Sequence, residues 1–66
     1  MNVRSYRKNR SLIEEVILSD KYDILIMQET WMKKPIAIPD TGYKVLDILS
    51  NQSKGLGIRM LIRQSI

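Results

Sequence analysis

The chain has 66 residues and a formal net charge of +4, and it contains no cysteine and no histidine. This length suits one small domain, because a chain of this size buries only about 60% of the surface that its unfolded form exposes. Without cysteine the chain has no disulfide and no thiolate zinc site, and without histidine it lacks the commonest metal ligand and general base. These absences exclude catalytic triads, Cys-His nucleophiles, zinc proteases and zinc fingers.

The positive charge is concentrated at the start of the chain. The first ten residues hold four bases and no acid, so the rest of the chain balances seven bases against seven acids. The basic group consists of Arg4, Arg7, Lys8 and Arg10, with Tyr6 among them. We expect residues 1–10 to form a basic N-terminal arm that contacts nucleic-acid phosphates, with a solvated arm as the alternative. Residues 11–66 would then form a single small unit.

A helical pattern follows the basic residues. Apolar side chains recur at the spacing of one helical face, at Leu12, Ile13, Val16 and Ile17. This spacing predicts an amphipathic helix near residues 11–20. Ser11 and Glu14 have the spacing of a capping box, in which the serine oxygen accepts from a first-turn amide and the glutamate binds the serine amide. The pair therefore predicts where the helix starts.

Three strands are predicted after the helix. The run over residues 23–28 is apolar without polar alternation, as in a strand buried on both faces. Residues 43–49 and 57–63 are rich in strand formers, and the polar stretch over residues 50–55 suits a hairpin loop between them. The last strand has an apolar side, with Ile58, Met60 and Ile62, and a mixed side, with Arg59, Leu61 and Arg63.

These elements predict an α/β or α+β fold, in which one helix lies on one face of a small mixed sheet of about three strands. The other face of the sheet has no covering layer within the chain. We therefore expect the chain to be marginally stable or unfolded alone, and to be ordered by a protein partner that covers this face. No apolar run approaches the roughly 20 residues of a membrane span, so we expect an intracellular, cytoplasmic protein without membrane contact.

Four short motifs occur in order along the chain. They are Asn2 to Ser5, Asp23 to Trp31, Ile38 to Tyr43, and Gly55 to Ile58. This series resembles the opening of the endonuclease/exonuclease/phosphatase superfamily, and it is most similar to the endonuclease domains of non-LTR retrotransposons. The resemblance covers nearly the whole chain. It implies that the fold is an incomplete piece of a larger α/β sandwich.

The resemblance also implies a metal site. Asn2 matches the asparagine that closes the first strand of the family, and Glu29 matches the glutamate that closes the second strand and coordinates a divalent metal. A carboxylate and an amide oxygen at adjacent strand ends are hard ligands that suit Mg²⁺. The alternatives are that Glu29 is a solvated acid at a strand end and that Asn2 is flexible next to the amino terminus.

The chain departs from the family in its catalytic machinery. The later aspartate and asparagine of the family, and its C-terminal histidine paired with an aspartate, have no counterpart here. The apolar residues that precede the asparagine in the family are also missing. We therefore expect the isolated chain to be no enzyme and to need no cofactor, with Mg²⁺ relevant only if another chain completes the site.

Three functions follow from these observations. The first is a non-catalytic, truncated nuclease-like basic protein that binds nucleic acid, more specifically RNA within a ribonucleoprotein such as a ribosome. Its contacts would be Arg4, Tyr6, Arg7, Lys8, Arg10 and Trp31. The alternative for Trp31 is burial under a neighbouring loop, which is the commoner fate of a lone tryptophan. The second is the N-terminal piece of a Mg²⁺-dependent phosphodiesterase that another chain completes. The third is a protein-interaction module that uses exposed strand edges.

Overall fold

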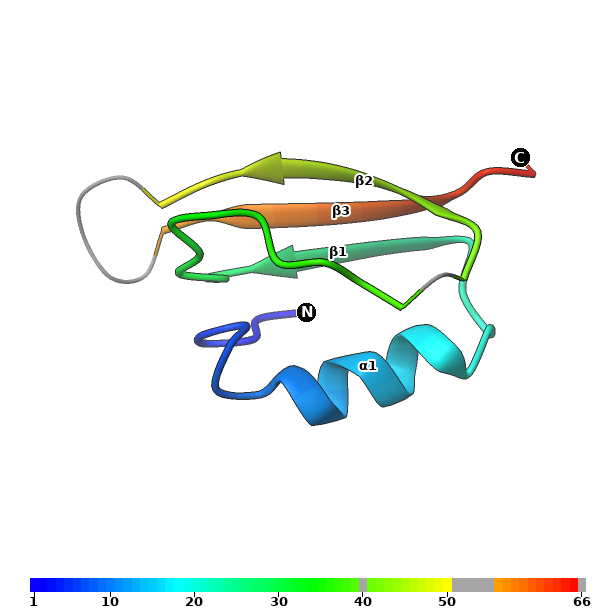
Figure 1. Cartoon of the computed structure of the whole chain (residues 1–66), viewed down its shortest axis with the longest axis horizontal. Coiled ribbons are helices and arrows are strands. Elements are labelled where there is room, and N and C mark those ends of the chain that lie inside the picture. Colours follow the sequence, from blue (N-terminus) through cyan, green and yellow to red (C-terminus); the bar gives the residue numbers. More distant parts are fainter. Residues whose placement is uncertain (40, 51–55, 66) are drawn as a thin grey trace.

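The structure is a computed structural model that describes residues 1–39, 41–50 and 56–65. Within these ranges the chain forms one helix and three strands: α1 (Arg10–Leu18), β1 (Ile24–Gln28), β2 (Tyr43–Ile48) and β3 (Ile58–Arg63). The helix lies along one face of the sheet (Figure 1). The predicted α/β class is confirmed, and each strand begins and ends within one residue of its expected range. Asp40, Gly55 and most of the predicted polar loop lie outside the described residues.

The last strand is the central one. The strand order is β1-β3-β2, and β3 pairs antiparallel with both neighbours. Opposite Arg59 of β3 stand Met27 of β1 and Asp47 of β2. Among the described residues, parallel pairing occurs only at an isolated bridge between Asn2 and Gln28. The mixed character expected of the sheet is limited to this bridge.

The predicted capping box is wrong. The helix begins at Arg10, one residue earlier than expected, and no described side chain caps its first turn. Ser11 lies inside the helix, and Glu14 instead binds Arg10, with 2.9 Å between its carboxylate and Nε. Arg10 and Glu14 are four residues apart, so their side chains are neighbours on the helix surface and can form an ion pair. Ser11 has no charge and cannot form such a pair with Glu14. The side-chain amide of Asn9 donates to the backbone carbonyl of Val3 at 2.9 Å and holds the turn before the helix.

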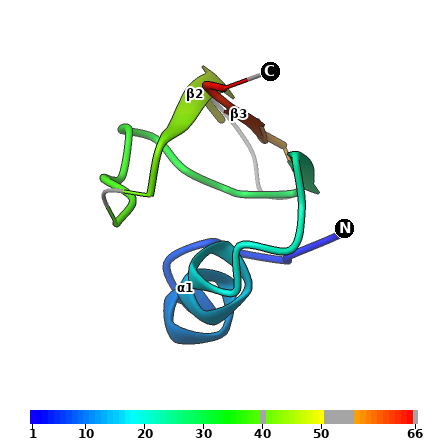
Figure 2. The same cartoon turned by 90° about the vertical axis from the view of Figure 1, so that its right-hand side faces the viewer.

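One face of the sheet carries the core. The buried side chains of this face are Leu25, Met27, Tyr43, Arg59 and Leu61. The apolar side chains of this set form one core cluster with Ile13 and Ile17 of α1. The segment after β1 lies on the same side of the sheet, beside the helix (Figure 2). It contributes the buried side chain of Met32 to the same core.

The other face of the sheet is apolar and open. Its exposed side chains include Ile24, Ile26, Leu46, Ile48 and Ile58, which are between 39% and 66% exposed. No described helix or loop covers them (Figure 2). The prediction that residues 23–28 are buried on both faces is therefore wrong, because β1 alternates between exposed and buried residues. The apolar side of β3 is therefore the open one, whereas the mixed side with Arg59 and Leu61 faces the core. Arg59 is tolerated on the core-facing side of β3 because its charge is neutralised inside the fold.

The first nine residues are packed onto the sheet and do not form a separate arm. Val3 and Tyr6 are 6% and 0% exposed. Their amides donate to the carbonyls of Gln28, at 2.9 Å, and Thr30, at 2.8 Å. Burial of two apolar side chains and this backbone pairing stabilise the segment against the solvated state. The expected division at residue 10 is therefore not seen, and the basic residues sit on an ordered segment.

A buried ion pair links the N-terminal segment to the sheet. The guanidinium of Arg59 donates from Nε and Nη2 to the two carboxylate oxygens of Asp47, at 2.7 and 2.8 Å. Its carbon lies 4.8 Å from the centre of the Tyr6 ring. Burial lowers the pKa of Arg59, but the hydrogen bonds and charge of Asp47 outweigh this effect and raise the pKa above its usual value. Arg59 is therefore charged and bound by one acid through Nε and Nη2, whereas its Nη1 is buried without a hydrogen-bond partner among the described residues.

A second arginine joins the opposite end of the sheet to the end of the helix. Arg63 binds Asp20 and Asp23, and its guanidinium carbon lies 5.1 Å from the centre of the Tyr43 ring. A hydrogen bond to Asp20 and, as the next largest cause, a hydrogen bond to Asp23 raise the pKa of Arg63. Both acids are well exposed, so this cluster fixes the chain's path more than it adds to stability.

We expect Asp47→Asn to lower the free energy of unfolding by about 3 to 5 kcal/mol, because it leaves the guanidinium of Arg59 buried without its counter-charge. Asp23→Asn is the matched control, because the same change there removes a partner of Arg63 that is 70% exposed. It should have little effect. Urea denaturation of both variants checks this, and equal losses would show that the buried pair has no special role.

Candidate functional site

The structure brings the two predicted metal ligands together. Asn2 and Glu29 are 27 residues apart in the sequence, and the amide of Asn2 donates to the carboxylate of Glu29. The parallel bridge between Asn2 and Gln28 produces this contact, because it places both residues at the same end of the sheet. Both side chains are exposed or partly exposed at the mouth of a hollow of about 290 Å³. Glu29 is partly exposed directly after β1, which also fits the alternative of a solvated acid at a strand end, and its contact with Asn2 links the two residues.

Backbone strain is concentrated around this contact. Among the described residues, four of the five non-glycine residues with positive φ lie here: Arg4, Ser5, Glu29 and Trp31. Such conformations cost of order 1 to 3 kcal/mol each and persist only where the surroundings hold them. Here the restraint is a set of backbone hydrogen bonds, including Ser5 to the carbonyl of Glu29 at 2.9 Å and Trp31 to the carbonyl of Leu56 at 3.0 Å.

The residues present do not make a complete metal site. Mg²⁺ takes six oxygen ligands in octahedral geometry. Asn2 and Glu29 supply one amide and one carboxylate, and the described part of the chain contains no group of three acidic, histidine or cysteine side chains suited to a metal. The described part of the chain therefore offers only part of a coordination shell.

The predicted nucleic-acid contacts differ in their availability. Arg4, Arg7 and Lys8 are exposed on the ordered N-terminal segment. Arg10 is also exposed, but its charge is paired with Glu14. The prediction for Tyr6 is wrong, because its ring is 0% exposed beneath the guanidinium of Arg59.

A second hollow gathers basic side chains from two segments. It has a volume of about 520 Å³, and its lining includes Arg7, Lys33 and Lys34. Trp31 lies on its wall, partly buried, and the indole Nε1 is buried without a described hydrogen-bond partner. The two lysines were missed in the sequence prediction, although their positions two and three residues after the tryptophan were a usable signal. We call Arg4, Arg7, Lys8, Lys33 and Lys34 the basic rim.

Comparison with protein-family models, with curated proteins and with solved structures finds no match for this chain. The resemblance to the endonuclease/exonuclease/phosphatase superfamily therefore rests on its motifs alone and stays a prediction. No helix in the described ranges is long and apolar enough to cross a membrane.

Gly57 lies directly before β3 and packs closely against Thr30 and Trp31. Its φ is +102°, and an added Cβ would lie 2.5 Å from the Thr30 hydroxyl oxygen and 3.3 Å from the Trp31 nitrogen. We expect Gly57→Ala to cost about 3 kcal/mol of folding free energy, from left-handed strain and overpacking together.

Gly42→Ala is the matched control for this prediction. Its φ is +80°, but an added Cβ would have nothing within 4 Å. It should cost about 1 to 2 kcal/mol from strain alone. Denaturant titration compares the two, and a smaller loss at Gly57 than at Gly42 would contradict the close packing of Thr30.

Proposed function

We propose that the chain is a non-catalytic, nuclease-like basic protein that binds the phosphate backbone of nucleic acid. The observation that carries this proposal is the hollow at which Arg7 meets Lys33 and Lys34. These cations come from two segments that lie far apart in the sequence and side by side in the fold. Clustered cations on an ordered surface favour phosphate contact because little backbone entropy remains to be lost on binding.

The chemistry of the basic rim favours a single-stranded nucleic acid. Phosphate contacts position a strand without selecting its sequence. Trp31 adds a partly exposed aromatic surface on the wall of the same hollow. Unstacked bases of single strands use such groups, whereas the bases of a duplex are not available to them. We therefore favour RNA within a larger intracellular assembly, where a protein partner also covers the open sheet face.

The rim is tested by a charge-matched pair of double variants. Arg7→Gln with Lys33→Gln should weaken binding to a single-stranded RNA oligonucleotide and reduce the slope of log K against log salt by about 1.4, at 0.7 for each lost phosphate contact. Lys21→Gln with Lys44→Gln removes the same charge from the opposite end of the molecule and should leave the slope unchanged.

Filter binding or fluorescence anisotropy across a salt series provides this measurement. Binding that does not depend on salt would remove the electrostatic premise. Equal losses in the two double variants would show that net charge, and not the rim, drives association.

A second candidate function is supported by the meeting of Asn2 and Glu29. We infer that the chain could supply these two ligands to a divalent-metal site that another polypeptide completes, as in a Mg²⁺-dependent phosphodiesterase. The support is geometric, because one amide and one carboxylate from distant parts of the sequence meet at one end of the sheet. The remaining ligands and the general base would come from the other chain.

Paramagnetic broadening tests this second candidate without requiring activity. We expect millimolar Mn²⁺ to broaden the amide signals of Asn2 and Glu29 in a two-dimensional NMR spectrum, because a partial oxygen site binds weakly. Glu29→Gln keeps the size of the side chain and removes its charge, so it should abolish the broadening. Broadening that persists in the variant would contradict a role for Glu29 as a ligand.

A further inference from the structure

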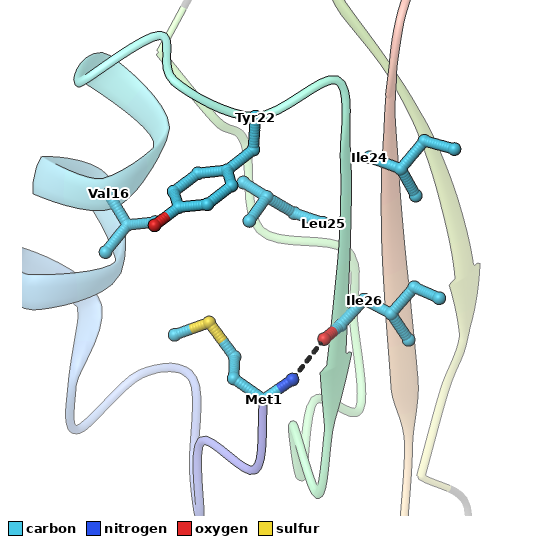
Figure 3. A pocket seen from close by; sticks show the side chains of 6 residues that line it. All are labelled: Met1, Val16, Tyr22, Ile24, Leu25 and Ile26. Atoms are coloured by element: carbon cyan, nitrogen blue, oxygen red, sulfur yellow. Dashed lines mark hydrogen bonds between the residues drawn. The ribbon is translucent and has the colours of Figure 1, made fainter.

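The outer edge of β1 is only partly paired. Met1 and Val3 run parallel to β1 and bond to its second half. The amino group of Met1 donates to the carbonyl of Ile26 at 2.6 Å, and the Val3 amide donates to the carbonyl of Gln28 at 2.9 Å. The first half of the edge has no neighbour in the described chain, and it lies across from the helix (Figure 3).

The unpaired backbone groups on this edge follow from the alternation of the strand. The even-numbered residues Ile26 and Gln28 bond to the N-terminal segment, whereas the carbonyl of Asp23 accepts from Arg63 on the β3 side at 2.8 Å. Successive residues of a strand point their backbone groups to opposite sides. The amide and carbonyl of Ile24 and the amide of Ile26 therefore face the open edge, and no described group binds them.

An apolar hollow adjoins these groups. It has a volume of about 480 Å³ and lies between α1 and β1. Figure 3 shows Val16, Tyr22 and Leu25 turned toward it, with Met1 at its base. The side chains of Ile24 and Ile26 point away, so these residues contribute backbone to the hollow. Among the described residues that line the hollow there is no acid, lysine or arginine, and its one charged group is the amino terminus of Met1, which is bound to the carbonyl of Ile26.

We propose that this edge binds an extended segment of a partner polypeptide as an additional strand, parallel to β1. Unpaired amides and carbonyls at strand spacing require a peptide backbone, which a compact apolar ligand does not have. The added strand would run in the same direction as residues 1–3, which already pair parallel to β1. Because side chains alternate along a strand, one apolar side chain of the segment enters the hollow and its neighbours point toward the open apolar face.

A second copy of this chain fits the edge less well. Two β1 edges related by a two-fold axis run antiparallel, and only the first half of each edge is available. A partner segment in the parallel direction can use the whole unpaired stretch and the hollow together. A concentration-dependent dimer that competes with peptide binding would overturn this choice of partner.

Hydrogen exchange with defined probe peptides tests the proposal. The probe is an acetylated, amidated hexapeptide with valine at alternate positions and threonine between them. It should slow the exchange of the Ile24 and Ile26 amides about tenfold or more at saturation, because both gain a hydrogen-bond partner. Unchanged exchange of these amides at millimolar peptide would overturn the proposal.

Two N-methylated versions of the probe separate strand addition from general apolar binding. Methyl groups on one alternating set of amides block the bonds to β1, whereas methyl groups on the other set face away. The version whose methyl groups block the bonds to β1 should no longer protect the Ile24 and Ile26 amides from exchange, whereas the version whose methyl groups face away should still protect them. Equal effects of the two versions would contradict a paired strand.

Substitution in the helix tests the hollow. Val16→Phe should fill it and weaken probe binding about tenfold or more, equivalent to 1.4 kcal/mol. Leu12→Phe is the control, because Leu12 lies on the same helix and is 64% exposed. Unchanged affinity in Val16→Phe would exclude the hollow as the side-chain site. If that variant fails to fold, the N-methylated probes on the unaltered chain still decide the question.

Discussion

The arrangement of the molecule depends on one buried charge. Arg59 lies in the central strand and its side chain is 1% exposed, so its charge must be neutralised within the fold. Asp47 provides the counter-charge from β2, and the ring of Tyr6 covers the guanidinium from the N-terminal segment. An unpaired charge in the interior would be strongly destabilising. The observed arrangement of three segments that are distant in the sequence neutralises the charge of the guanidinium, and the pairing of Arg59 with Asp47 also fits the register of β2 on β3.

The position of the N-terminal segment has consequences for the surface. Because Tyr6 is drawn into the core, Arg4, Arg7 and Lys8 are held outward on ordered backbone instead of on a mobile tail. The same packing brings Asn2 against Glu29 and imposes left-handed conformations on several neighbours. The strain is retained because backbone bonds to β1 and to the start of β3 hold these residues from both sides. The proposed nucleic-acid surface and the partial metal-ligand pair are thus products of one packing event.

Burial is confined to one side of the sheet. A helix of nine residues and the segment after β1 cover one face, and the opposite face keeps isoleucine and leucine side chains in solvent. The edge of β1 beside α1 is likewise only half paired. A chain of this length has too few residues to cover both faces and all edges. Its cationic and apolar surfaces are separate, which is consistent with simultaneous contact to a nucleic acid and to a protein in one assembly.

The sequence by itself determined the elements, because apolar spacing along the chain is a local property that identifies the helix, the three strands and the uncovered face. It also placed Asn2, Glu29 and most of the basic residues among the candidates. It did not determine that residues 1–9 pack onto the sheet, that Tyr6 is buried, or that Lys33 and Lys34 meet Arg7. The capping box failed for a local reason, because an alternative pair of Arg10 and Glu14 was available once the turn at Asn9 had formed. Only the tertiary structure decided the packing of residues 1–9, the burial of Tyr6 and the meeting of the lysines with Arg7, since each of these depends on contacts between segments that are far apart in the chain, and above all on where the charge of Arg59 is neutralised.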